Sequence, residues 1–119
     1  MISDVTKSSI KYFLNICQKE IPKGNCYFIE NRMIDMNGKV ISAKQALLDI
    51  GILNKKQILN IILTLEEKDC IKVDFDKDHS RDTNSEIYIF KKEYNKNIIY
   101  IKLTMRKKGI ICLSFHRSY

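Results

Sequence analysis

The sequence predicts a single α+β domain in which N-terminal helices pack on a C-terminal antiparallel β-sheet. Up to about residue 65, apolar residues recur with the 3.6-residue period of helices. After Asp69 they alternate with the two-residue period of strands. Helices followed by a run of strands are typical of α+β folds. The chain has 119 residues and no linker-like tract, so one domain over residues 1–119 is expected.

Three helices are predicted in the N-terminal half. The first covers residues 4–20, where apolar side chains recur at i, i+3, i+4 and i+7. After a possible short strand at 26–29, Ser42 is a suitable N-cap for the second helix, and Gly51 closes it in the C′ position. Asn54 is expected to cap a third helix. The inner stripe of this helix consists of Ile58, Ile61, Ile62 and Leu65.

Four strands are predicted in the C-terminal half, and the last two form a hairpin. In both of these strands apolar and polar residues alternate, so each strand has one face suited to the core. The expected strands cover residues 71–75, 87–90, 98–104 and 110–115, with a polar loop at 76–85. The expected core positions of the hairpin are Ile99, Ile101, Leu103, Ile111, Leu113 and Phe115.

The register of the hairpin follows from this alternation. A two-residue loop at Lys107-Lys108 would place Leu103 opposite Cys112, which mixes the apolar and polar faces. A three-residue loop that ends at Gly109 places Leu103 opposite Leu113, and Gly109 then adopts the left-handed conformation that such loops need. We expect the longer loop, because a slip of one residue would move the core face into water.

In the expected register, chemically useful groups meet on the polar face of the hairpin. Tyr100 lies opposite His116, and Lys102 lies opposite Ser114. Cβ atoms of opposed residues are about 4.5–5.5 Å apart. A phenol, an ammonium, a hydroxyl and an imidazole would therefore share one patch. An ordinary solvated sheet face is the alternative interpretation.

The composition indicates a polyanion as partner and argues against a metal or membrane protein. The net charge is +7 and the pI is about 9.2, which favours RNA or DNA binding. No apolar run reaches the roughly 20 residues of a membrane span, and no secretory signal is visible, so a cytoplasmic protein is expected. The four cysteines form no C-x-x-C pair and only two histidines are present, so no metal and no other cofactor is expected.

The C-terminal half resembles the MqsR family, the RNA-cleaving toxins of type II toxin–antitoxin systems. The similarity runs over residues 42–116, and its most specific parts are Tyr100-Ile101-Lys102-Leu103 and Ser114-Phe115-His116. The resemblance implies a RelE-like fold, an mRNA substrate, a cognate antitoxin partner and cleavage without a metal or cofactor. By position in the family motifs, it also implies functional roles for Lys72, Tyr100 and His116.

The residues themselves suit metal-free cleavage of RNA, in which the substrate's 2′-hydroxyl is the nucleophile. His116 is the candidate acid or base, because imidazole exchanges protons near neutral pH. Lys72 and Lys102 would stabilise charge on the phosphate, while Tyr100 would hydrogen-bond the phosphate or stack on a base. The residues expected to make further contacts with the substrate are Ser114, Lys107 and Lys108.

Two other classes of function fit parts of the sequence. Residues 42–90 also match a winged helix-turn-helix, in which Lys55, Lys56 and Asn60 would face a DNA groove. That interpretation explains the positive charge but not the last two strands. The third alternative is an interaction domain that binds no nucleic acid.

Overall fold

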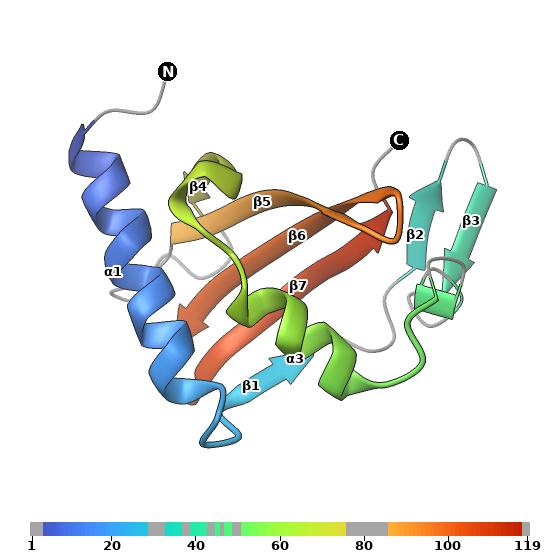
Figure 1. The fold of residues 1–119 in the computed structure, drawn as a ribbon, viewed down its shortest axis with the longest axis horizontal. Coiled ribbons are helices and arrows are strands. Elements are labelled where there is room, and N and C mark those ends of the chain that lie inside the picture. The colour runs from blue at the N-terminus through green and yellow to red at the C-terminus, as the bar shows by residue number, and fades with distance from the viewer. Residues whose placement is uncertain are drawn as a thin grey trace.

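The computed structural model describes residues 4–28, 33–36, 39–42, 45, 47–48, 51–75 and 86–117. Within them, two helices accompany a five-stranded sheet of order β1-β7-β6-β5-β4, so the predicted α+β class is confirmed (Figure 1). No helix of this described part is both long and apolar enough to cross a bilayer. The elements are α1 (Asp4–Glu20), β1 (Cys26–Phe28), β2 (Met33–Met36), β3 (Lys39–Ser42), α3 (Lys55–Leu63), the 3-10 turn η1 (Glu67–Asp69), β4 (Cys70–Phe75), β5 (Glu86–Tyr94), β6 (Asn97–Arg106) and β7 (Gly109–Arg117).

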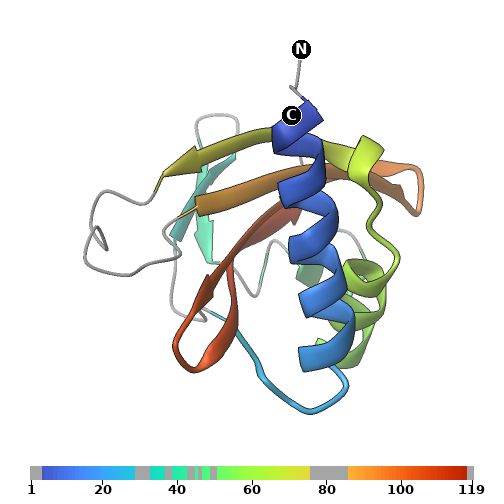
Figure 2. The ribbon, with the colours of Figure 1, turned by 90° about the vertical axis from the view of Figure 1, so that its left-hand side faces the viewer.

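Helices α1 and α3 cover the same face of the sheet, as Figure 2 shows. The apolar stripe of α1 is buried, and Phe13 stacks on Tyr88 of β5 with ring centroids 4.1 Å apart. The Tyr88 hydroxyl lies 2.8 Å from the hydroxyl of Ser9, which satisfies its polar end. The predicted stripe of α3 is also in the core, which leaves the opposite face of the sheet without either helix.

The predicted start of α3 at Asn54 is confirmed by its capping contacts. The side chain of Asn54 accepts a hydrogen bond of 3.0 Å from the backbone N–H of Gln57. In return, the Gln57 side chain accepts bonds from the backbone N–H groups of Asn54 and Leu53. This capping box satisfies N–H groups that a helix start otherwise leaves without partners.

The end of the second predicted helix has the expected glycine. Gly51 has a φ of +81°, and its N–H bonds to the Leu48 carbonyl while that of Ile52 bonds to Leu47. These two bonds are those of a Schellman motif. Residues 45, 47 and 48 are helical, whereas the rest of this helix lies outside the described residues. The expected N-cap, Ser42, is the last residue of β3, which pairs with β2 in a separate ribbon that was not predicted.

The β6–β7 hairpin corrects the predicted register near its turn. Arg106 pairs with Gly109, so the connection is the two-residue Lys107-Lys108 and the three-residue loop is wrong. Leu103 consequently lies opposite Cys112, but a β-bulge at Leu113 shifts the register. Beyond the bulge, every predicted pair is confirmed: Ile101 with Phe115, Tyr100 with His116, and Lys102 with Ser114.

The bulge also changes which residues of β7 enter the core. Between the turn and the bulge, Ile110 and Cys112 take the core positions, whereas Ile111 shares the opposite face with Thr104. Ile111 and Leu113 are buried, as predicted, but they lie outside the cluster beneath the helices, so only the face predicted for them is wrong. The prediction failed because it assumed one constant alternation along the strand, and an extra residue inverts that alternation.

A close approach between two strands explains the glycine at position 109. The predicted strand at 26–29 is confirmed as β1, but it pairs with β7 in parallel, so the sheet is not wholly antiparallel. The N–H of Ile110 donates to the carbonyl of Asn25 at 2.9 Å. A Cβ at Gly109, where φ is +141°, would lie 2.5 Å from that same oxygen. Gly109 therefore admits β1 to the sheet edge, a different role from the predicted one.

The fold does not match the winged-helix alternative. β4 and β5 continue through β6 and β7 in one sheet, whereas a wing would consist of two strands alone. Figure 1 shows β5 within this sheet, between β4 and β6, rather than projecting from the domain.

The corrected register makes a testable distinction between two leucines. Leu103 is fully buried in the core cluster, so Leu103→Ala is expected to lower the free energy of unfolding by about 2–5 kcal/mol. Leu113→Ala is expected to cost less, because Leu113 lies outside that cluster. Urea unfolding of both variants, with exposed Tyr12→Ala as control, measures the difference. A larger loss for Leu113→Ala would contradict the bulge.

Candidate active site on the sheet face opposite the helices

Strand pairing assembles most of the predicted site on the sheet face opposite the helices. Lys72, Ile89, Lys102 and Ser114 are successive partners and form one row across β4, β5, β6 and β7. The next row contains Lys91, Tyr100 and His116. Rows on one face lie about 6.6–6.8 Å apart and neighbouring strands about 4.7–4.9 Å apart. We define the polar face as Lys72, Lys91, Tyr100, Lys102, Ser114 and His116.

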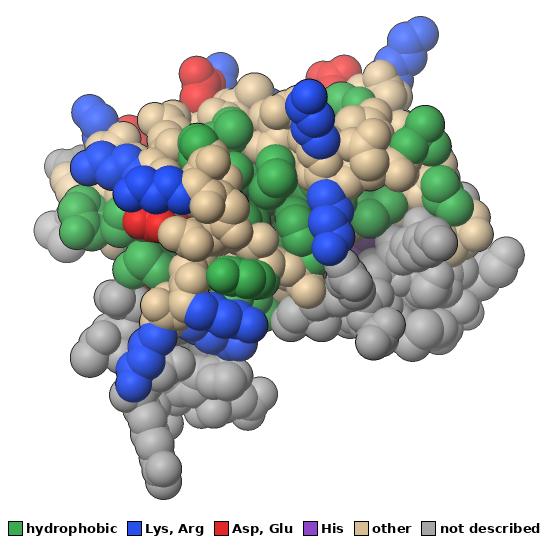
Figure 3. Space-filling model, turned by 90° about the horizontal axis from the view of Figure 1, so that it is seen from below, with side chains coloured by type: hydrophobic (Ala, Val, Ile, Leu, Met, Phe, Trp, Pro, Cys, Tyr) green, Lys and Arg blue, Asp and Glu red, His purple; other side chains and the backbone are tan. Residues whose placement is uncertain are grey.

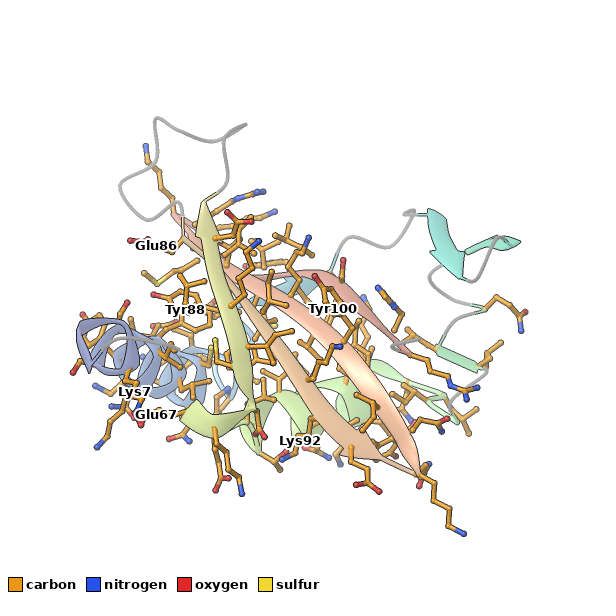
Figure 4. The ribbon with its side chains drawn as sticks, turned by 90° about the horizontal axis from the view of Figure 1, so that it is seen from above. Lys7, Glu67, Glu86, Tyr88, Lys92 and Tyr100 are labelled. Carbon is orange, nitrogen blue, oxygen red and sulfur yellow. The ribbon has the colours of Figure 1, made fainter. Side chains whose placement is uncertain are left out.

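Side-chain directions agree with this assignment of faces. In Figure 4, Tyr88 points towards α1, whereas Tyr100 lies on the other side of the sheet. Lys92 points to the helix side, where its ammonium lies 3.5 Å from the Asp69 carboxylate and 3.4 Å from the Thr64 carbonyl. Lys92 is therefore held in contacts with η1 and the end of α3, while its neighbour Lys91 belongs to the polar face.

Tyr100 and His116 form the centre of the polar face. Their rings stack with centroids 5.2 Å apart and an interplanar angle of 24°. Nδ1 of His116 lies 2.9 Å from the backbone carbonyl oxygen of Arg117. Because a carbonyl oxygen only accepts, Nδ1 carries the proton in this contact. In the neutral ring, Nε2 then retains its lone pair and can accept a proton.

Lys72 and Lys102 lie in the row next to the row of Tyr100 and His116. The Lys72 ammonium lies 3.4 Å from the carboxylate of Asp74, and the two side chains are 63% and 51% exposed. Exposed ion pairs contribute only about 0–1 kcal/mol, so Lys72 can exchange Asp74 for a phosphate at little cost. Lys102 is half-buried, and buried Ile89 lies between the two lysines. The polar face therefore presents two ammonium groups with the buried, apolar side chain of Ile89 between them.

Lys91 is a member of the polar face that the sequence analysis did not identify as a site residue. It is exposed and lies directly opposite Tyr100. The signal that could have found it is the pairing of β5 with β6, because only the register of the last hairpin was worked out from the sequence. Extension of the antiparallel pairing by one strand places Lys91 beside the tyrosine.

The two lysines of the β6–β7 turn do not join the polar face. Lys107 and Lys108 are exposed at the turn, five and six residues along the chain from Lys102. At about 3.4 Å per residue, this separation is roughly 17 Å or more. The ammonium of Lys108 instead lies over the ring of Tyr27, 4.7 Å from its centroid. Any contact of these lysines with the substrate is therefore at a distance from His116.

Three of the four cysteines are buried and Cys26 is half-buried, and these thiols do not suit metal binding or nucleophilic attack. Burial raises the pKa of Cys17 to about 12 and that of Cys26 to about 11. Burial likewise raises the pKa of Cys70 and Cys112, so all four thiols stay protonated near neutral pH. Within the described ranges, no group of three or more His, Cys, Asp or Glu residues could hold a metal ion. The other histidine, His79, lies outside the described residues.

The fold and this face define a class of protein: a small basic α+β domain with a lysine-, tyrosine- and histidine-bearing sheet face opposite its helices. Residues 27–117 match the family model described as motility quorum-sensing regulator, toxin of MqsA. The chain therefore belongs to the MqsR toxin family, whose members are toxins with an antitoxin partner, as the sequence resemblance implied. No curated protein matches the chain. The matched range contains α3 and all five strands that form the sheet, with only the first residue of β1 outside it.

Proposed function

We propose that this toxin is a metal-independent endoribonuclease that cleaves mRNA through the substrate's own 2′-hydroxyl. The observation that carries the proposal is the shared face of His116, Tyr100 and two lysines, with Nδ1 of His116 tied to a carbonyl. Metal-free cleavage requires a base, an acid and cations around one phosphate. Each of these groups is present on the polar face.

In the proposed reaction, Nε2 of His116 accepts the proton of the 2′-hydroxyl as its oxygen attacks the neighbouring phosphorus. A bond from phosphorus to the 2′-oxygen forms, and the bond to the 5′-oxygen of the next nucleotide breaks. The ammonium groups of Lys72 and Lys102 stabilise the charge of the phosphorane and can donate a proton to the departing oxygen. The products are a 2′,3′-cyclic phosphate and a free 5′-hydroxyl.

Tyr100 has a positioning role in this mechanism. Its ring stacks on the imidazole of His116, which restricts the directions that Nε2 can take. Its hydroxyl, two positions along β6 from the Lys102 row, can also donate to a phosphate oxygen. Ser114, directly opposite Lys102, is placed to bind a phosphate or sugar oxygen of the same nucleotide.

The overall charge supports RNA as the substrate. The net charge of +7 attracts the RNA backbone. The polar face places Lys72, Lys91 and Lys102 on the same side of the sheet as the imidazole of His116. We propose mRNA as the RNA in question and the cognate antitoxin as the protein that suppresses the activity, in keeping with the family.

Expression of the chain tests this proposal. Induced expression is expected to stop growth and deplete mRNA, and co-expression of the cognate antitoxin is expected to reverse both effects. In vitro, purified protein with EDTA should cut RNA to a 2′,3′-cyclic phosphate and a 5′-hydroxyl, while a 2′-deoxy nucleotide at the cut should block the reaction. Mass spectrometry of the ends checks the chemistry. Activity that disappears on chelation, or 5′-phosphate ends, would overturn the mechanism.

A further inference from the structure

A hollow lies at the β1 edge of the sheet, away from the residues of the polar face. Its volume is about 370 Å³. Segments far apart in the sequence contribute to it: β1, the start of α3 and the β6–β7 turn. The side chains that define its chemistry are Tyr27, Phe28, Lys55, Leu59 and Lys108.

The lining combines aromatic rings with cations. The ammonium of Lys108 lies 4.7 Å from the centroid of the Tyr27 ring, and that of Lys55 lies 5.9 Å from the Phe28 ring. Tyr27 is 38% exposed, so part of its ring is open to a partner. None of the lining residues that the structure describes is acidic. Figure 3 shows the underside of the molecule, which includes the β1 edge, with lysine and arginine side chains beside hydrophobic ones.

This combination suits a nucleotide of single-stranded RNA. Bases stack on aromatic side chains in a sequence-tolerant way, while lysines bind the backbone phosphates beside them. The positive charge of Lys55 and Lys108 complements a polyanion. The ammonium of Lys108, which is exposed beside the Tyr27 ring, is placed to contact a phosphate next to a base stacked on that ring.

Strand pairing links the hollow to the polar face. Tyr27 lies opposite Ile111 of β7, and Ile111 lies opposite Thr104 of β6. Thr104 is two residues from Lys102, so this row is adjacent to the row of Lys102 and Ser114 on the same face. By strand spacing, the backbone of Tyr27 is on the order of 10 Å from that of Ser114.

We propose that this hollow is an accessory RNA-binding site, in which a base stacks on Tyr27 and the adjoining phosphate contacts Lys108. The inference rests on the proposed ribonuclease function. It adds the position of the part of the RNA strand that lies away from the cleaved bond. The hollow contributes affinity for RNA, while the polar face performs the chemistry.

The test measures the affinity of the full chain for a short single-stranded RNA. The probe is a fluorescein-labelled RNA of eight nucleotides with 2′-O-methyl groups throughout, which cannot be cleaved by the 2′-hydroxyl route. Fluorescence anisotropy at fixed salt gives the Kd. Tyr27→Leu keeps apolar bulk but removes the ring face and is expected to weaken binding about 5- to 150-fold. Tyr27→Phe keeps the ring and should bind as the wild type does.

Two further variants separate stacking from charge and from stability. Tyr12→Leu changes a tyrosine of α1 that is 69% exposed and outside the hollow, and it should leave the Kd unchanged. Lys108→Ala should reduce the slope of log Kd against log salt by about 0.7, because one phosphate contact is lost. Lys108 is exposed, so this variant remains informative even if Tyr27→Leu unfolds.

The outcomes separate this inference from the proposed function. Wild-type protein that binds and cleaves RNA, with unchanged affinity in Tyr27→Leu and an unchanged slope in Lys108→Ala, would overturn the accessory site alone. Wild-type protein that neither binds nor cleaves RNA would overturn the proposed function as well. If Tyr27→Leu weakened binding of the antitoxin while RNA affinity stayed the same, the hollow would belong to a protein partner.

Discussion

His116→Ala is expected to lower the rate of RNA cleavage by about 10²–10⁴-fold, the usual effect of losing a proton-transfer group. The variant removes the Nε2 atom that the Nδ1 contact with Arg117 leaves available. RNA affinity should change little, because it comes largely from contacts with the charged backbone. Single-turnover cleavage of one RNA in EDTA measures the rate, and the anisotropy assay measures binding.

Two controls make this prediction specific to the imidazole. Tyr100→Phe keeps the ring that stacks on His116 and loses only the hydroxyl, so it should retain far more activity than His116→Ala. Added imidazole should restore part of the activity of His116→Ala, because a free base can occupy the space that the side chain leaves. Equal rates for wild type and His116→Ala would remove His116 from the reaction.

Lys102→Ala is expected to lower the cleavage rate by about 10²–10³-fold, by analogy with the loss of one donor that stabilises a charged transition state. Lys102 is half-buried between Ile89 and Ser114, where a charge is screened less by water than at an open surface. Lys102→Arg retains the charge and should recover part of the rate. Cleavage rates measured at saturating RNA separate a loss of catalytic rate from a loss of RNA affinity.

Lys107→Ala is the matched control, because it removes a lysine from the same hairpin outside the polar face. It should alter affinity and salt dependence while the rate at saturating RNA stays unchanged. Lys72→Ala should have a smaller effect than Lys102→Ala, since Lys72 is more exposed and already paired with Asp74. A loss of rate in Lys107→Ala as large as that in Lys102→Ala would indicate a general electrostatic effect instead of a specific one.

Membership of the toxin family and the geometry of the polar face are two independent lines of support for the proposed function. The family match covers residues 27–117, but it does not say which side chains meet. The strand register supplies that information, and it brings together the residues at the family's motif positions: Lys72, Tyr100 and His116. Lys91 is added to them by the same pairing.

Several features depended on local chemistry and could be predicted from the sequence. The stripe of α1 and the Asn54 cap of α3 follow from residues within a few positions of one another. Gly51 ends its helix because glycine adopts the left-handed conformation without strain. The pairing of Tyr100 with His116 was also predicted, because burial of Ile101 and Phe115 determines the register far from the turn.

Only the tertiary structure decided the features that depend on distant segments. Leu113 becomes an extra residue in β7, so the strand presents Phe115 to the core on one side of the bulge and Ile110 and Cys112 on the other. The short edge strand β1 pairs in parallel with β7 because Gly109 lets the Asn25 carbonyl approach. Periodicity reports which face of one strand is apolar. Which strands are neighbours, and how closely their backbones approach, depends on packing over the whole chain, so the place of Lys91 beside Tyr100 and of Tyr27 beside Lys108 appeared only in the folded molecule.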